Sequence, residues 1–336
     1  MIEVKNLVKK YGSHLAVDHL NFKVETGQIY GFLGPNGAGK STTMNIMTGY
    51  LGATEGEVLI NGHNILEEPE EAKRCIGYLP EIPPLYVEMK VWEYLHFVAE
   101  LKKIPKKARE DQVQRVMSMV KLTDVQNRLI KNLSKGYRQR VGLAQAILGF
   151  PEIIILDEPT VGLDPKQIIE IRELIRELAK THTVILSSHI LAEIQEVCDY
   201  IMIISKGKLV ASDTPENLEK LLSGQQTVEI LARGSEEDVK KIVKSVDGVL
   251  DASFRAGSEA GTVGGSLVPK EGTDIREQVF RAFANASCPL LLLYHSRTTL
   301  EDVFLELTQG AEASPTVEEA MREAVGKEDE EDAGDL

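Results

Sequence analysis

The first chemistry-bearing pattern in the chain is a glycine-rich stretch that ends in a lysine and a serine. It runs from Gly34 to Ser41, reads GPNGAGKS and matches the spacing GxxxxGK[ST]. Glycines let backbone N–H groups turn inward around phosphate oxygens, and a helix that begins near Lys40 adds the positive end of its dipole. The stretch predicts a nucleotide site in which Lys40 bridges the β- and γ-phosphates and Ser41 holds Mg²⁺. The residues expected to bind the nucleotide here are Gly34, Pro35, Asn36, Gly37, Ala38, Gly39, Lys40, Ser41 and Thr42.

A pair of acidic residues follows an apolar run further along the chain. Residues Ile153–Leu156 predict a buried strand, and Asp157 and Glu158 come directly after it. This arrangement delivers Asp157 to a metal ion, through water, and places Glu158 to accept a proton from an attacking water molecule. Taken alone, the pair also fits a strand end with solvated acids. Downstream of the glycine-rich stretch, it predicts a metal residue and a general base.

A third element lies between these two and opens a predicted helix. It runs from Leu133 to Arg140 and reads LSKGYRQR. Ser134 is typical of a helix N-cap, and its hydroxyl together with the N–H of Gly136 can bind a phosphate at the helix start. In isolation this is an ordinary helix cap, so its meaning depends on the elements around it.

In their order along the chain, the three elements resemble those of the ATP-binding cassette (ABC) ATPases. Other landmarks of that family follow the same order: Gly162–Asp164 (GLD) is similar to the D-loop, and Ser187–His189 (SSH) to the segment with the switch histidine. Tyr11, in KKYG, is similar to the aromatic residue on which the adenine ring stacks. The resemblance covers Met1 to about Leu222 and implies ATP and Mg²⁺ as cofactors.

The chain departs from the usual family pattern at two motifs. The common signature is LSGGQ, whereas Lys135 and Tyr137 here replace its first glycine and its glutamine. The family's glutamine loop, which senses Mg²⁺ and the transport subunit, has Glu81 in its place. A carboxylate accepts from a metal-bound water but cannot donate as an amide does, so Glu81 is expected at the metal together with Ser41 and Asp157. Both departures resemble the ATPases of type-2 exporters. Within that branch, the added C-terminal domain and its ending, TLEDVFLELT, resemble the drug, lipid and gliding-motility-associated subunits.

The resemblance also implies a mechanism. One phosphate loop and one signature per chain imply a head-to-tail dimer, either a homodimer or a pair of paralogues, with two ATP molecules at the seam. Ser134 and Gly136 would contact the ATP held by the other subunit, and Asp164 would communicate across the seam. Lys40, Glu158 and His189 are the expected catalytic residues, with His189 holding the γ-phosphate and the water in line.

The elements that position these residues predict an α/β fold. Gly27–Leu33 predicts a strand before the glycine-rich turn, and apolar strands then alternate with helices from residue 153 to residue 213, which favours a buried, mostly parallel sheet. A largely helical stretch from residue 91 to residue 148 is expected between them. We therefore expect a P-loop NTPase cassette of the ABC type over residues 1–222, with a helical subdomain at about 85–150.

A second pattern begins after a predicted boundary at Ser223–Gln226. Residues 227–309 predict the order βαββαβ, which is typical of a ferredoxin-like α+β domain. A last helix is expected to pack through Leu300, Val303, Phe304 and Leu307. Residues 311–336 contain ten acidic and two basic residues, and they predict an acidic, disordered tail.

Composition narrows the class of protein. The 336 residues are 43% hydrophobic and 27% charged, which is typical of a globular chain. The net charge is −14, of which the tail carries −8, so the body is mildly acidic and nucleic-acid binding is not expected. No apolar run is long enough for a membrane span and no secretory signal is expected. Three scattered cysteines fit a reducing cytoplasm.

The leading hypothesis is the ATP-binding and hydrolysing subunit of an ABC exporter, held at the cytoplasmic face of the membrane by separate permease subunits. Cytoplasmic helices of those subunits are expected to dock near Glu81 and residues 82–95 (IPPLYVEMKVWEYL), although internal packing of these residues is an equal alternative. The main alternative function is an ABC ATPase that acts on ribosomes or nucleic acid; a regulatory or scaffolding module is a third. The sequence does not reveal the transported substrate.

Overall fold

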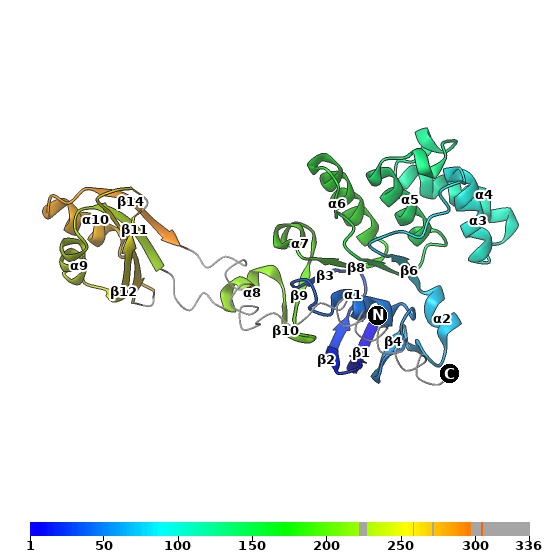
Figure 1. Cartoon of the computed structure of the whole chain (residues 1–336), viewed down its shortest axis with the longest axis horizontal. Coiled ribbons are helices and arrows are strands. Elements are labelled where there is room, and N and C mark those ends of the chain that lie inside the picture. Colours follow the sequence, from blue (N-terminus) through cyan, green and yellow to red (C-terminus); the bar gives the residue numbers. More distant parts are fainter. Residues whose placement is uncertain (222–226, 258, 271, 297–303, 305–336) are drawn as a thin grey trace, which may run out of the picture. The chain divides into compact units, whose positions relative to one another are not determined.

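The structure is a computed structural model that describes residues 1–221, 227–257, 259–270, 272–296 and 304. The chain divides into two compact units, Met1–Pro215 and Glu216–Leu305, which Figure 1 shows. The expected boundary at Ser223–Gln226, the expected tail and three of the four packing residues of the last helix lie outside the described residues.

The central element of the first unit is a sheet that, in the part of the chain described, has six strands in the order β10-β9-β3-β8-β7-β6. Its strands are β3 (Ile29–Leu33), β6 (Ile76–Leu79), β7 (Ile153–Leu156), β8 (Thr183–Ser188), β9 (Tyr200–Ser205) and β10 (Lys208–Asp213). All neighbours pair in parallel except β10, which pairs antiparallel with β9. The expected mostly parallel sheet is therefore confirmed. The carboxyl ends of its parallel strands share one edge, which is where ligands bind in such folds.

A separate antiparallel sheet covers one end of this unit, in the order β2-β1-β4-β5. It consists of β1 (Ile2–Tyr11), β2 (His14–Val24), β4 (Glu55–Ile60) and β5 (His63–Asn64). Residue types along the chain do not show that these strands form a sheet of their own. That outcome depends on β4, which pairs with β1 from across the glycine-rich loop and its helix.

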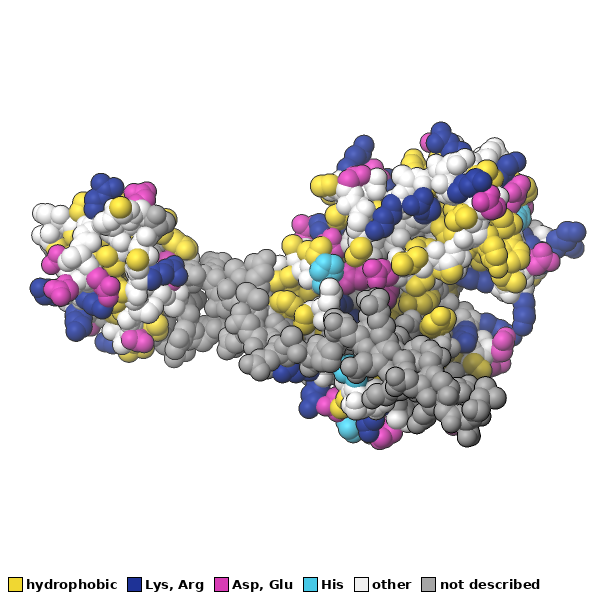
Figure 2. All heavy atoms as spheres, in the orientation of Figure 1, with side chains coloured by type: hydrophobic (Ala, Val, Ile, Leu, Met, Phe, Trp, Pro, Cys, Tyr) yellow, Lys and Arg dark blue, Asp and Glu magenta, His cyan; other side chains and the backbone are white. Residues whose placement is uncertain are grey.

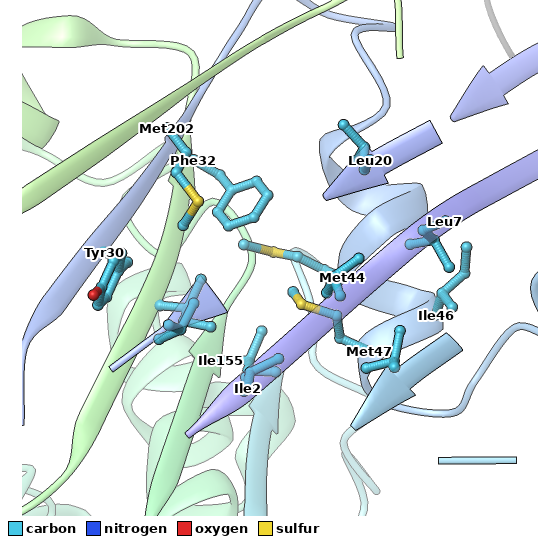
Figure 3. Packing of buried hydrophobic residues seen from close by; sticks show 14 of the residues in the cluster. Ile2, Leu7, Leu20, Tyr30, Phe32, Met44, Ile46, Met47, Ile155 and Met202 are labelled. Carbon is cyan, nitrogen blue, oxygen red and sulfur yellow. The ribbon is translucent and has the colours of Figure 1, made fainter. Parts of the chain in front are cut away.

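The core of the unit joins the two sheets through the helix that follows the glycine-rich loop, α1 (Lys40–Met47) (Figure 3). Met44, Ile46 and Met47 of α1 are each no more than 1% exposed. They belong to the same buried cluster as residues of both sheets, among them Ile2, Leu7, Leu20, Phe32, Ile155 and Met202. Since packed side chains resist displacement, this cluster fixes the start of α1 at the edge of the central sheet.

Three of the remaining helices described in the first unit form the helical subdomain, and three others lie elsewhere in the unit. Those of the helical subdomain are α3 (Val91–Leu101), α4 (Lys106–Met119) and α5 (Lys135–Ile147), with the short turns η1 (Thr123–Val125) and η2 (Ile130–Asn132). They contact one another, so the expected helical stretch is one packed group. The others are α2 (Pro69–Arg74), α6 (Pro165–Ala179) and α7 (Leu191–Val197).

The second unit has the predicted order βαββαβ. Helix α8 (Pro215–Leu221) begins at the boundary between the two units and precedes this order. The elements of the order are β11 (Thr227–Arg233), α9 (Glu236–Lys244), β12 (Val249–Ala256), β13 (Thr262–Pro269), α10 (Arg276–Asn285) and β14 (Leu290–Ser296). The four strands form an antiparallel sheet in the order β12-β13-β11-β14. The buried apolar residues of α9 and α10 pack on it, with Phe283 fully buried. This is the ferredoxin-like arrangement that the sequence predicts. Within the residues described, no helix is both long and apolar enough to cross a membrane.

Candidate functional site

The glycine-rich loop joins β3 to α1 at the carboxyl edge of the central sheet, and two of its positions leave no room for a side chain. A Cβ on Gly34 would lie 2.3 Å from the carbonyl oxygen of Ile204, and one on Gly39 would lie 2.6 Å from that of Ala16. Gly39 also has a φ of +102°, which other residues rarely adopt. Space alone therefore requires glycine at position 34, whereas space and backbone conformation both require it at position 39.

Lys40, the first residue of α1, turns back into this loop. Its side chain is 6% exposed, and its Nζ donates to the carbonyl oxygens of Gly34, at 2.7 Å, and Pro35, at 3.2 Å. Burial lowers the pKa of the Lys40 ammonium, although the nearby carboxylates of Glu158 and Asp157 oppose this shift. The nearest ion-pair contact is with Glu158 Oε1, at 3.8 Å. Neutral carbonyls hold the ammonium, so its charge is left for an anion in the loop.

Two hydroxyl groups converge on Asp157, the first acid after β7. Ser41 Oγ donates to Asp157 Oδ1 at 3.3 Å, and Ser187 Oγ donates to the same oxygen at 2.6 Å. Ser41 belongs to α1 and Ser187 to β8, so three elements meet at one carboxylate. A hydroxyl and a carboxylate oxygen are ligands of the kind that Mg²⁺ prefers, and Ser41 with Asp157 fits such an ion.

Glu158, the second acid, faces the histidine that follows β8. His189 Nδ1 lies 3.0 Å from Glu158 Oε2, and the Glu158 side chain is 9% exposed whereas that of His189 is 43% exposed. The backbone of Glu158 is left-handed, with a φ of +46°, and its N–H donates to Ser187 Oγ at 2.9 Å. A non-glycine residue in this conformation is strained, and such residues concentrate at functional sites.

These groups line one cleft of 680 Å³ at the carboxyl edge of the sheet. The predicted site residues that line it are Tyr11, Asn36, Gly37, Ala38, Gly39, Lys40, Ser41, Thr42, Glu81, Glu158 and His189. Gly34, Pro35 and Asp157 adjoin it through their hydrogen bonds with Lys40 and Ser41. The cleft thus combines groups that can bind an anion, the Lys40 ammonium and nearby hydroxyls, with two groups that can transfer a proton, the Glu158 carboxylate and the His189 imidazole.

The signature residues and Asp164 do not line this cleft. Ser134 is the N-cap of α5 and accepts from the N–H of Tyr137 at 3.4 Å, as the sequence predicts for a cap. Asp164 is the N-cap of α6 and accepts from the N–H of Gln167 at 3.0 Å. The Gln167 side chain lies directly over Gly136, where a Cβ would be 2.1 Å from its Oε1. The signature and the D-loop of one chain therefore adjoin each other, away from that chain's own cleft.

Three residues at the cleft carry roles that sequence reasoning did not assign. Asn45 and Val161 line it, and Ser187, beside it, donates to the Asp157 carboxylate and accepts from the backbone N–H of Glu158. A signal for Ser187 exists in the sequence, because a serine at the end of a fully apolar strand needs a hydrogen-bond partner when buried. Which residue it bonds depends on the pairing of β7 with β8, which residue types alone do not show.

Comparisons with known proteins agree with this geometry. The model of the ABC transporter family matches residues 17–161. The bacitracin transport ATP-binding protein BcrA of Bacillus licheniformis is 35% identical over 320 residues, which are 92% of this chain and 98% of that protein. The lantibiotic transport ATP-binding protein SrtF of Streptococcus pyogenes is 35% identical over 67% of this chain and 97% of its own length.

Solved structures show the same likeness over about two thirds of the chain. An ATP-binding subunit of an ABC transporter is 31% identical with a TM-score of 0.61, over 66% of this chain and 92% of that one. A dimeric post-hydrolysis form of the cassette MJ0796, bound to ADP and Pi, is 26% identical with a TM-score of 0.59, over 64% of this chain and 98% of that one. These comparisons lend no support to the alternative of an ATPase that acts on ribosomes or nucleic acid.

Proposed function

The chain belongs to the family of ABC transporter ATP-binding subunits, and on that premise we propose that it hydrolyses ATP in the cleft between α1, β7 and β8 to power export through membrane permease subunits. One observation carries the hydrolysis: Glu158 Oε2 and His189 Nδ1 lie 3.0 Å apart beside the ammonium of Lys40 in a phosphate-binding loop. A base, an orienting imidazole and a cation at one anion site are the parts that phosphoryl transfer to water requires.

The residues of the cleft have distinct parts in this reaction. The backbone N–H groups of residues 36–42 and the ammonium of Lys40 bind the β- and γ-phosphates. Ser41 and Asp157 would hold Mg²⁺, which neutralises phosphate charge when bound, and Glu81, which lines the cleft, would accept from its water. Glu158 takes the proton from the attacking water, and His189 holds the γ-phosphate and that water in line. Tyr11 stacks on the adenine ring.

Completion of the site requires a second cassette. Ser134 and Gly136 lie outside this chain's own cleft, and the start of α5 offers N–H groups to an anion. We propose that they contact the γ-phosphate held by a partner subunit in a head-to-tail dimer, with Asp164 at the seam. The dimeric structure of MJ0796, which this chain resembles, supports this arrangement. A homodimer and a pair of paralogues both satisfy it.

The permease would dock in a second groove that adjoins the cleft. This groove has a volume of 650 Å³ and shares Ser41, Asn45 and Glu81 with the nucleotide cleft. Tyr50 and Ile82 line it and are 84% and 83% exposed. Figure 2 shows hydrophobic side chains gathered on the surface near α3, α5 and β6. Apolar side chains next to the site are the contact surface that a helix of a membrane subunit needs, so we propose that the protein is held at the cytoplasmic face of the membrane.

The stretch 82–95 divides between the two roles that the sequence left open. Ile82 and Pro84 line the groove, and Tyr86 is 59% exposed. Val91 and Leu95 are fully buried in the helical subdomain instead. We therefore place the permease contact in the first half of the stretch, whereas the second half contributes Val91 and Leu95 to the core and leaves Trp92 36% exposed.

The test is affinity purification of the tagged protein from detergent-solubilised membranes, followed by mass spectrometry. A polytopic membrane protein in fixed stoichiometry is the expected result, and the variant Ile82→Asp should lose it while keeping ATPase activity. Leu66→Asp is a matched control, since Leu66 is 56% exposed and does not line the groove. Recovery with ribosomal or DNA-repair partners, and no membrane protein, would overturn the transport role and leave the ATPase chemistry intact.

A further inference from the structure

The end of β8 is hydrogen-bonded to the segment that follows β7 on both faces of the strand, directly through Ser187 and indirectly through Ser188. Successive side chains on a strand point to opposite faces, so Ser187 and Ser188 lie on different sides. Ser187 bonds directly to the two acids, as described above. Ser188 Oγ donates instead to Glu193 Oε2 at 3.1 Å, and Thr160 Oγ1 donates to that same oxygen at 2.5 Å. Glu193 Oε2 thus accepts one hydrogen bond from the end of β8 and one from the segment after β7.

The bonded hydroxyls flank the catalytic pair in the sequence. Thr160 is two residues beyond Glu158, and Ser188 directly precedes His189. Ser188 Oγ also accepts from the N–H of Ile190 at 3.0 Å, so the turn that carries His189 is bonded on both sides of the histidine. A shift of the Glu193 carboxylate would therefore displace the segments that carry both Glu158 and His189.

Glu193 lies on a helix that is packed tightly against the central sheet. It lies in α7, is 6% exposed, and is flanked on the same helix by buried Leu191 and Ile194. α7 packs on β3 so closely that a Cβ on Gly31 would lie 2.6 Å from Ile194 Cγ2. Since a helix held this tightly cannot shift easily, its carboxylate is a fixed point for the two segments that bond to it.

We propose that Glu193 is a positioning residue for hydrolysis. Its Oε2 fixes Thr160 and Ser188 relative to each other, and this keeps Glu158 Oε2 within hydrogen-bond distance of His189 Nδ1. Charged acceptors form stronger hydrogen bonds than neutral ones, and a buried network in which each member is bonded is rigid. The proposal rests on the proposed function, because it concerns the same reaction in the same cleft.

The test compares Glu193→Gln and Glu193→Leu with the wild-type protein in steady-state ATPase assays. Leucine has no acceptor, so Glu193→Leu should lower kcat about 10- to 100-fold by misplacing the pair, with KM for ATP within about twofold. Glutamine can place its carbonyl oxygen where Oε2 lies, so Glu193→Gln should keep most of kcat. Glu196→Leu is the matched control on the same helix, since Glu196 contacts Arg172 and its side chain is 58% exposed.

A purely structural role predicts a different pattern. It predicts that Glu193→Leu lowers the melting temperature and nucleotide affinity together, or that glutamine and leucine act alike. Either result, or an unchanged kcat in Glu193→Leu, overturns the proposal. If the wild-type protein hydrolyses no ATP, the proposed function itself fails.

A second set of variants covers the case in which Glu193→Leu does not fold. Thr160→Val and Ser188→Ala each remove one hydroxyl and little volume. Each should lower kcat at unchanged ATP affinity, and the double variant should be no worse than about the product of the two effects. Wild-type kcat in both variants would contradict the proposal.

Discussion

The imidazole of His189 and the carboxylate of Glu158 face each other across the ends of two parallel strands, with Nδ1 3.0 Å from Oε2. Glu158 reaches this position through a left-handed backbone, with a φ of +46°. The strained conformation is held by the bond from its N–H to Ser187 Oγ. This geometry supports the proposal that Glu158 takes the proton from the attacking water while His189 holds that water and the γ-phosphate in line.

Glu158→Gln should bind ATP as the wild-type protein does but hydrolyse it at least about 100-fold more slowly, because an amide of the same shape cannot act as the base. Phosphate release measures turnover, and titration with a fluorescent nucleotide measures binding. Glu152→Gln, a carboxylate outside the cleft, serves as the control. Wild-type turnover in Glu158→Gln would show that another group takes the proton.

The affinity for MgATP should fall at alkaline pH because of Lys40. Burial lowers the pKa of its ammonium below the ordinary 10.5. Only the protonated form attracts phosphate, so affinity is full below the lowered pKa and is lost as pH rises through it, before pH 10.5 is reached.

Lys40→Arg supplies the comparison, because a guanidinium stays charged throughout this range. Nucleotide titrations at rising pH, up to the ordinary pKa of 10.5, should show a decline in the wild-type protein that the arginine variant lacks, whatever its absolute affinity. Parallel pH dependences in the two proteins would exclude Lys40 as the titrating group.

Gly39→Ala should destabilise the first unit and abolish nucleotide binding. The added Cβ would lie 2.6 Å from the carbonyl oxygen of Ala16, and the loop would hold the alanine at a φ of +102°. The close contact and the backbone strain together cost about 3 kcal/mol or more of folding free energy. Gly12→Ala has the milder strain alone, with a φ of +55° and no atom within 4 Å. Thermal unfolding should place Gly39→Ala well below Gly12→Ala, and equal melting temperatures would mean that the loop can move aside.

Tyr11→Ala should weaken ATP binding by about tenfold while leaving the affinity for inorganic triphosphate unchanged, because ring stacking acts on the base alone. Tyr11→Phe keeps the ring and should bind ATP as the wild-type protein does. Competition titrations with both ligands separate these effects. A similar loss for ATP and triphosphate would place Tyr11 in the support of the phosphate loop instead.

Much of the fold was predictable because its signals are local. An apolar strand, a glycine-rich turn and an amphipathic helix each occupy a few consecutive residues, as they do from Ile29 to Met47. The βαββαβ order of the second unit was predictable for the same reason. The antiparallel sheet of β1, β2, β4 and β5 was not, since its central pairing joins strands separated by the whole of β3 and α1.

The site divides in the same way. The sequence by itself determined which residues can do chemistry, because GPNGAGKS, the two acids after β7 and the SSH segment each carry their residue types at fixed spacing. Only the tertiary structure decided which atoms meet: Ser187 with Asp157, His189 with Glu158, and Glu193 with Thr160 and Ser188. Hydrogen bonds act over about 3 Å, and the first two of these pairs, about 30 positions apart, reach that distance because the parallel strands β7 and β8 end at the same edge of the sheet. Glu193 reaches Thr160 and Ser188 because α7 packs beside β8.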